Sequence, residues 1–194
     1  MASDDRDPGL DRPRGLPLGI DEEPGTIYIP VDVFTEPLDT LCTWVVVGER
    51  FGEIGQWASP IIASAMDGPP GTGQVRTCQI AGFGPIGPGV IKERLVHFDP
   101  AARSLAYEAV AGMPAFIKHA VNRWSVRAGP GGGSTVEICA TVTLRPAARP
   151  LGAVLRWRMR ADTRRVLAEL RHRVETGQPH PAKAAAQADG TARR

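Results

Sequence analysis

Apolar and polar residues alternate with a period of two through much of the chain, a pattern typical of β-strands with one buried face. The first such segment is Thr26–Phe34, and six more follow at the short spacing of successive hairpins. These six segments are Ile61–Met66, Gly73–Phe83, Gly89–Phe98, Ser104–Ala111, Ile117–Arg127 and Ser134–Leu144. The segments between them are rich in Gly, Pro and Asp, which favour turns. The pattern therefore predicts a seven-stranded antiparallel sheet.

Three helices are predicted around these strands. Two are short and follow the first strand, over Glu36–Val47 and Phe51–Trp57. The third begins at Pro150, where apolar residues start to recur at spacings of three, four and seven. These residues are Leu151, Val154, Leu155, Met159, Val166, Leu167, Leu170 and Val174. A proline near the first turn and Gly177 at the end are typical helix boundaries and predict a helix of about 25 residues.

These elements predict an α+β fold in which a curved seven-stranded antiparallel sheet wraps around a long C-terminal helix, with two short helices after the first strand. The apolar side of the helix would face the sheet. One helix cannot fill the concave side of a sheet this wide. We therefore expect an internal cavity that accepts an apolar ligand.

Composition divides the 194 residues into one domain and two tails. Hydrophobic residues make up 42% and include four Trp, which excludes a wholly disordered chain. The 22 Gly and 18 Pro show no G-X-Y period, which excludes collagen. We expect a disordered leader over 1–25, a ligand-binding domain over 26–176 and a disordered tail over 177–194.

Charge is concentrated near the C-terminus, where residues 145–194 carry twelve basic and four acidic side chains, a local charge of +8. We expect a solvated helix face here and no nucleic-acid partner, because few aromatic residues accompany the arginines. The longest apolar run is too short to cross a bilayer, so we expect no membrane partner. Three widely spaced cysteines and the lack of a signal peptide predict a reduced, cytoplasmic protein. Its expected state is a monomer or homodimer.

Four stretches in order resemble the START/SRPBCC superfamily, which has the helix-grip fold of the birch allergen, and in particular its polyketide cyclase/dehydrase-like branch. They are TWVVVGERFGEIGQWASPII (43–62), GTGQVRT (71–77), VIKERLVHFDPAARSLAYEAVAGMP (90–114) and STVEICATVTLRP (134–146). The resemblance implies a cavity that opens between the long helix and two loops. The matching residues here are Phe83–Gly89 and Gly112–Phe116, the two candidate gates.

The resemblance also implies a hydrophobic small-molecule ligand of polyketide type. The protein would bind this ligand and promote its cyclisation and dehydration without a cofactor. Such an enzyme would act in secondary metabolism. The alternative is a non-catalytic carrier, sequestering or self-resistance protein with the same cavity, because this fold hosts both kinds of function.

Glu93 is the first candidate for chemistry. Alternation in its predicted strand puts on one face Ile91, Glu93, Leu95 and His97. Glu93 is then a carboxylate among apolar neighbours, which is costly unless it is paired or hydrated. It either holds or deprotonates a ligand, or forms a structural ion pair with Arg76. The resemblance supports the first role, because related plant-hormone receptors have a pocket Glu in this ERL motif.

Arg76 and Tyr107 complete the candidate catalytic set. The resemblance turns Arg76 inward, where its fixed donors would stabilise oxyanion charge; a solvent-facing Arg is the alternative. Tyr107 shares a strand face with Leu105 and Ala109 and would move protons. The candidate substrate-binding residues are Trp57, Cys78, Ile80, Phe83, Ile91, Leu95, Met113, Phe116, His119 and Met159.

Other features leave questions open or exclude functions. In the sixth strand, the inward residues are either Ile117, His119 and Val121 or Phe116, Ala120 and Trp124. The run Gly82–Gly87 satisfies GxGxxG, but a strand follows it, and a dinucleotide fingerprint requires a helix there. The four His lie in no metal-ligand spacing, so no metal is expected.

Overall fold

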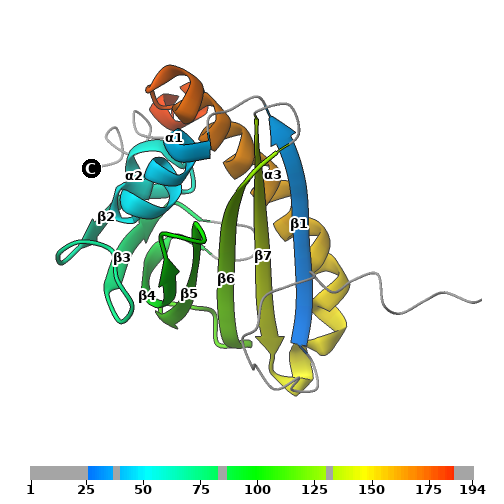
Figure 1. Ribbon diagram of the computed structural model, residues 1–194. Coiled ribbons are helices and arrows are strands. Elements are labelled where there is room, and N and C mark those ends of the chain that lie inside the picture. Colours follow the sequence, from blue (N-terminus) through cyan, green and yellow to red (C-terminus); the bar gives the residue numbers. More distant parts are fainter. Residues whose placement is uncertain (1–25, 37–39, 83–86, 130–132, 186–194) are drawn as a thin grey trace, which may run out of the picture.

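The computed structural model describes residues 26–36, 40–82, 87–129 and 133–185. Within these residues the chain forms one seven-stranded sheet in the order β1-β7-β6-β5-β4-β3-β2 (Figure 1). The strands are β1 (Thr26–Glu36), β2 (Ile61–Met66), β3 (Val75–Ile80), β4 (Gly89–Asp99), β5 (Ser104–Ala111), β6 (Ile117–Ala128) and β7 (Ser134–Leu144). Every neighbouring pair is antiparallel, which confirms the predicted sheet.

Strands β1 and β2 lie at opposite edges of the sheet although they follow one another along the chain. Short helices join them, namely α1 (Thr40–Trp44), the π-helical η1 (Val45–Glu49), the 3-10 turn η2 (Phe51–Glu53) and α2 (Ile54–Trp57). The first predicted helix was placed too early, because Glu36 is the last residue of β1. A proline follows Glu36 in the sequence and disfavours the helical conformation at the residue before it.

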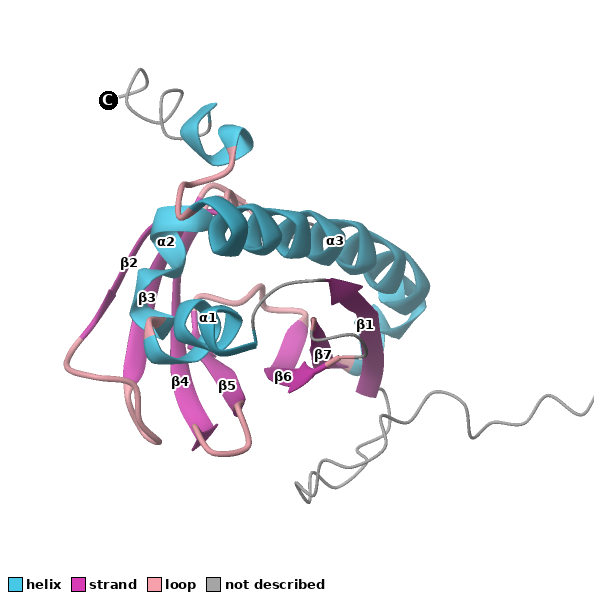
Figure 2. Cartoon of the chain, turned by 45° about the horizontal axis from the view of Figure 1, so that its top comes forward, coloured by secondary structure: helices cyan, strands magenta, loops and turns pink. Residues whose placement is uncertain are grey.

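The long helix α3 (Gly152–Thr176) lies across the concave side of the sheet, as Figure 2 shows. The 3-10 helix η4 (Pro146–Leu151) precedes it, and the N–H of Gly177 donates to the carbonyl of Arg173 at its end. Leu155, Val166, Leu167 and Leu170 are buried against the core. Leu151 and Val154, which the periodicity placed on the same face, are exposed. The helix is therefore less amphipathic in its first turns than predicted.

Two irregularities in the sheet decide which side chains face inward. A register shift between Leu95 and His97 breaks the alternation of β4. His97 consequently leaves the inner face and its Nε2 lies 2.9 Å from Ser104 Oγ. Phe98 packs against the core instead, with its ring stacked on Trp44 at 5.9 Å. The predicted inward position of His97 is therefore wrong, because a bulge reverses the alternation.

A second register shift, between Ile117 and His119, settles the open question in β6. Past the shift, the residues of β6 that line the interior are Ala120, Asn122 and Trp124, together with Val121 between them. Ile117 also lines it, because the extra residue at the bulge restores its direction.

Residues 177–185 lie against the domain, which differs from the disorder expected for them. Residues 181–185 form a helical turn. Lys183 is fully buried, and its Nζ donates to the carbonyl of Ile61 at the start of β2. Burial lowers the pKa of Lys183, and the carboxylate of Glu169 opposes that shift. The buried ammonium fixes this part of the tail to the edge of the sheet where α2 ends.

Candidate functional site

A cavity of about 140 Å³ lies between the sheet, α2 and α3. This is well above the roughly 10–15 Å³ that one water needs. Most of its wall is apolar, and the apolar lining residues are Ile54, Ala58, Pro60, Ile61, Ile80, Ile91, Ala109, Met113, Ile117, Ala120, Val121, Trp124, Ile138, Val142, Leu155, Met159 and Val166. The curvature of the sheet leaves a space that α3 does not fill, as the sequence predicts.

Four lining residues carry polar side chains, namely Glu93, Tyr107, Asn122 and Thr163. They come from β4, β5, β6 and α3, so the polar groups are distributed over neighbouring elements around an apolar space. The Thr163 hydroxyl donates to the carbonyl of Met159 within its own helix. A ligand in this cavity would therefore be mostly apolar and would meet a small number of fixed polar groups.

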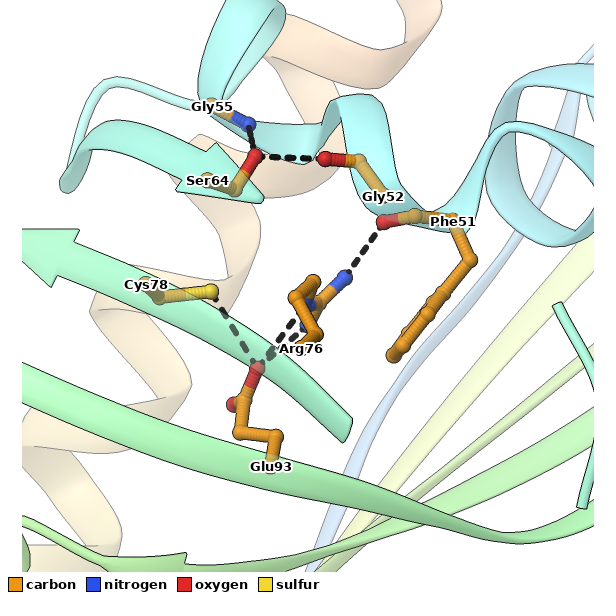
Figure 3. A network of polar contacts seen from close by, with 7 residues as sticks. All are labelled: Phe51, Gly52, Gly55, Ser64, Arg76, Cys78 and Glu93. Carbon is orange, nitrogen blue, oxygen red and sulfur yellow. Dashed lines mark hydrogen bonds and ion pairs between the residues drawn. The ribbon is translucent and has the colours of Figure 1, made fainter. Parts of the chain in front are cut away.

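The Glu93 carboxylate is held by Arg76 on the neighbouring strand, where the two residues pair directly (Figure 3). Both Nε and Nη2 of Arg76 donate to the same oxygen, Glu93 Oε2, at 2.9 Å and 2.6 Å. The Cys78 thiol donates to this oxygen as well, at 3.4 Å. The other oxygen, Oε1, has no hydrogen-bond partner among the described residues. Glu93 itself is one of the residues that line the cavity.

Each of the three guanidinium nitrogens of Arg76 donates a hydrogen bond to a neighbouring group, and Arg76 is not among the residues that line the cavity. Its side chain is 1% exposed, and its Nη1 donates to the carbonyl of Phe51 at 2.8 Å. The guanidinium carbon lies 3.6 Å from the centre of the Phe51 ring and 5.0 Å from that of Tyr107. Burial alone would lower the pKa of Arg76, but Glu93, Cys78 and Tyr107 together outweigh it and raise that pKa. Arg76 is thus a permanent cation that positions Glu93.

The helical segment before β2 places Phe51 over Arg76. Ser64 on β2 donates its hydroxyl to the carbonyl of Gly52 at 2.6 Å and accepts the N–H of Gly55 at 2.8 Å (Figure 3). These two bonds join η2 and α2 to the edge strand. The Phe51 ring is therefore held in place against the side of the Arg76 guanidinium that faces away from the sheet.

Burial raises the pKa values of two other groups near Glu93. The pKa of the Cys78 thiol rises from an ordinary value of 9.0 to about 12, mainly through burial. The pKa of Tyr107 is also raised, first by burial and then by the charge of Glu93. Both groups therefore keep their protons at neutral pH. Tyr107 is left as a neutral phenol in the cavity wall.

One of the two candidate gates is described in full. At Gly112 the backbone has a φ of 84°, and a Cβ there would lie 2.0 Å from the carbonyl oxygen of Val90. Only glycine permits this approach of the loop to β4. The next residue, Met113, lines the cavity. In the other gate, Phe83 to residue 86 lie outside the described residues, so the prediction for Phe83 stays a prediction.

The structure places six of the predicted site residues in the cavity wall: Ile80, Ile91, Glu93, Tyr107, Met113 and Met159. Five others and His119, which is described below, lie elsewhere. Arg76 and Trp57 border a separate space of about 10 Å³ that Tyr107 also lines. Leu95 and Cys78 are packed in the core, and Phe116 packs against its border.

His119 lies on the outer face of the sheet, away from the cavity. Its Nε2 is 3.1 Å from Oε1 of Glu108, which alternates along β5 with the cavity-lining Tyr107 and Ala109. The bulge at the start of β6 turns His119 outward. The expected contact of His119 with the ligand therefore has no support in this geometry.

Two polar lining residues were not singled out in the sequence analysis, namely Thr163 on α3 and Asn122. Asn122 lies in β6 and pairs with Tyr107 across the strands. Asn122 shares the face of Ala120 and Trp124, which was one of the two open alternatives for β6, and alternation alone does not decide between them. Among the described residues, no group of three or more His, Cys, Asp or Glu is placed to hold a metal ion. Nor does any described helix have the length and apolarity to cross a membrane.

Comparison of the structure with solved structures shows the same fold. Ara h 8.0201 superimposes with a TM-score of 0.61 at 15% identity, over 78% of this chain and 99% of that one. The Zhui aromatase/cyclase from Streptomyces sp. R1128 gives 0.60 at 18% identity, over 80% of this chain and 99% of the other. A protein from Nitrosospira multiformis gives 0.57 at 15% identity, over 78% and 97%.

Comparison at the level of sequence identifies the family. A search of curated proteins finds no match. The sequence profile of the family described as "Polyketide cyclase / dehydrase and lipid transport" matches residues 43–175, which run from the end of α1 to the last turn of α3 and include every strand except β1. This match supports a role in binding hydrophobic molecules, as the cavity does. The chain belongs to the polyketide cyclase/dehydrase and lipid transport family.

Proposed function

We propose that the protein binds a hydrophobic small molecule of polyketide type in the cavity and promotes its cyclisation and dehydration. One observation carries the proposal: Glu93 lines an apolar cavity, and Arg76 holds one of its carboxylate oxygens while the other accepts no hydrogen bond from the described residues. A fixed base beside a folded, reactive chain is what such a reaction needs, because the cavity supplies proximity and the base removes a proton. The fold shared with an aromatase/cyclase agrees with this proposal.

In the proposed reaction, Glu93 takes a proton from the carbon between two carbonyl groups of a poly-β-ketone. The resulting enolate carbon attacks a second carbonyl carbon of the same chain, and one carbon–carbon bond forms as the carbonyl π bond breaks. The Glu93 carboxyl group, which carries the first proton, returns it to the new alkoxide. Glu93 then takes a second proton from the carbon beside the new hydroxyl group and passes it to the departing oxygen, so that a carbon–carbon double bond forms, the carbon–oxygen bond breaks and one water leaves. Tyr107, a neutral phenol in the cavity wall, donates a hydrogen bond to the oxygen on which charge develops.

Arg76 has a different role from the one expected for it. Its three donor nitrogens are engaged by Glu93 and by the carbonyl of Phe51. It is therefore proposed as a positioning residue that orients Glu93, and it does not grip the ligand. We further propose a cytoplasmic protein of secondary metabolism that needs no cofactor and is a monomer or homodimer.

The test is incubation with synthetic poly-β-ketones, followed by mass spectrometry and ultraviolet absorption. We expect loss of water and the absorption of an aromatic ring. Glu93→Gln should reduce the rate by at least about 100-fold, whereas the outward-facing Glu108→Gln should leave it unchanged. Circular dichroism must show that both variants are folded under the assay conditions. Tight binding of an unchanged ligand by the wild type would show a carrier and refute the catalytic part of the proposal.

A further inference from the structure

The outer side of α3 carries an apolar stripe that nothing else in the described structure covers. At about 100° per residue, Val154, Trp157 and Ala161 fall on one side of the helix, and all three are exposed. Val154 is 64% exposed and Trp157 is 69% exposed. Leu151, the last residue of η4, is 52% exposed just before the helix begins. The other three tryptophans, Trp44, Trp57 and Trp124, are buried.

Arginines flank this stripe on both sides. Arg156, Arg160 and Arg164 follow one edge, and Arg158 and Arg165 follow the other; all five are exposed. The only acidic residues between positions 151 and 170 are Asp162 and Glu169. Both are buried, and Oδ2 of Asp162 forms an ion pair with Nε of Arg158 at 3.5 Å. The exposed side of this segment, from here on the Trp157 face, therefore carries charge of one sign around an apolar centre.

We propose that the Trp157 face binds the surface of a bilayer that contains anionic phospholipids, with the indole of Trp157 inserted at the level of the headgroups. A helix that lies flat on a membrane combines an apolar stripe containing Trp with Lys or Arg at its edges. Each Arg near an anionic surface adds to the attraction. A lipid surface fits better than a protein partner, because the stripe is narrow and lies on a convex helix, and a single large ring projects from it.

The position of α3 gives this contact a consequence for the cavity. The inner side of the same helix contributes Leu155, Met159, Thr163 and Val166 to the cavity wall. Docking through the Trp157 face would place the bilayer on the outer side of the helix whose inner side forms this wall of the cavity. The proposal revises the expectation of no membrane partner, and it concerns attachment to a surface without any spanning segment. It stands on the exposed face alone and does not depend on what the cavity holds.

The experiment uses the full chain and vesicles of phosphatidylcholine, with or without phosphatidylglycerol. Binding is followed by co-sedimentation and by quenching of tryptophan fluorescence with brominated acyl chains. Because the other tryptophans are buried, quenching reports on Trp157. We expect binding to the anionic vesicles, quenching by the brominated lipid and weakening with added salt. Failure to bind anionic vesicles at low salt would overturn the proposal.

Matched variants separate this face from charge in general. Trp157→Ala should weaken binding by at least about tenfold, and Arg156→Ala with Arg160→Ala by about 30-fold. The control pair Arg94→Ala with Arg127→Ala removes the same charge from the sheet and should have little effect. An equal loss of vesicle binding in the two double variants would overturn the proposal. So would light scattering that shows a dimer of the wild type and a monomer of Trp157→Ala, because the face would then join two copies of the chain.

Discussion

Arg76 directs two nitrogens, Nε at 2.9 Å and Nη2 at 2.6 Å, to a single oxygen of Glu93. A bidentate pair would engage both carboxylate oxygens, but here both nitrogens bind one oxygen, and the residue that carries it lines the cavity. The pair therefore anchors a charge at the wall of an apolar space. Its strength determines both the stability of the domain and the position of the proposed base.

Removal of the negative partner should destabilise the fold. Glu93→Gln leaves the buried Arg76 without a counter-charge, so we expect the free energy of unfolding to fall by about 3–5 kcal/mol. Glu108→Gln is the control, because Glu108 pairs with the half-exposed Arg94 and should cost about 0–1 kcal/mol. Urea unfolding followed by circular dichroism gives both values. Similar losses in the two variants would contradict the account of a buried ion pair.

Replacement of both charges should restore stability without restoring function. The double variant Arg76→Met with Glu93→Leu has an apolar pair of similar size and should recover most of the stability lost in Glu93→Gln. It has no base, so turnover of a poly-β-ketone should stay at the level of Glu93→Gln. The comparison is made by unfolding and by mass spectrometry on the same samples. A stable double variant with wild-type turnover would exclude Glu93 from the chemistry.

The close approach at Gly112 should be sensitive to one methyl group. Gly112→Ala combines a positive φ with a Cβ that would overlap the carbonyl of Val90. We expect a loss of more than about 1 kcal/mol, because alanine is strained at positive φ and the backbone must also move. Gly71→Ala is the matched control, since a Cβ there meets nothing within 4 Å. A melting temperature unchanged by Gly112→Ala would show that the loop is not held as described.

Alkaline pH should weaken the fold through Cys78. Its thiol ionises near pH 9.0 in the unfolded chain and near pH 12 in the folded protein. Its contribution to stability is thus complete below pH 9 and is lost as pH rises toward 12, with a slope of up to about 1.4 kcal/mol per pH unit. Tyr107 acts in the same direction because its pKa is also raised.

Lys183 acts in the opposite direction, because burial lowers its pKa. The comparison that isolates the thiol is therefore wild type against Cys78→Ala, with the exposed Cys42→Ala as control. The decline of unfolding free energy between pH 9 and pH 11, measured in urea, should be smaller in Cys78→Ala and unchanged in Cys42→Ala. Identical declines in all three proteins would contradict the assignment.

The fold could be predicted from the sequence because each strand alternates over many residues and a short turn ends it. The bounds of Ile61–Met66, Ser104–Ala111 and Ser134–Leu144 agree with the structure residue for residue. Alternation also placed Glu93 and Tyr107 in the cavity wall. These features depend on local periodicity and on a sheet too wide for one helix.

What could not be predicted depends on single residues and distant contacts. The bulge between Leu95 and His97 shifts the alternation by one position, and no composition signal marks it. The bulge at the start of β6 turns both Ile117 and Ala120 inward, so alternation alone could not decide which face of β6, and hence whether Asn122, lines the cavity. Lys183 lies in a polar, proline-containing segment, yet its ammonium is bound to a carbonyl 122 positions earlier. Such a contact requires the folded sheet.

The central claim is that the space between the sheet and α3 is a binding site. The most direct measurement is titration with N-phenyl-1-naphthylamine, a neutral apolar probe whose fluorescence rises on burial. Wild type should bind it saturably. Ala109→Phe, which fills the cavity, should weaken binding by at least about tenfold, whereas its exposed neighbour Val110→Phe should bind as the wild type does. Equal binding by the wild type and a folded Ala109→Phe variant would contradict the account.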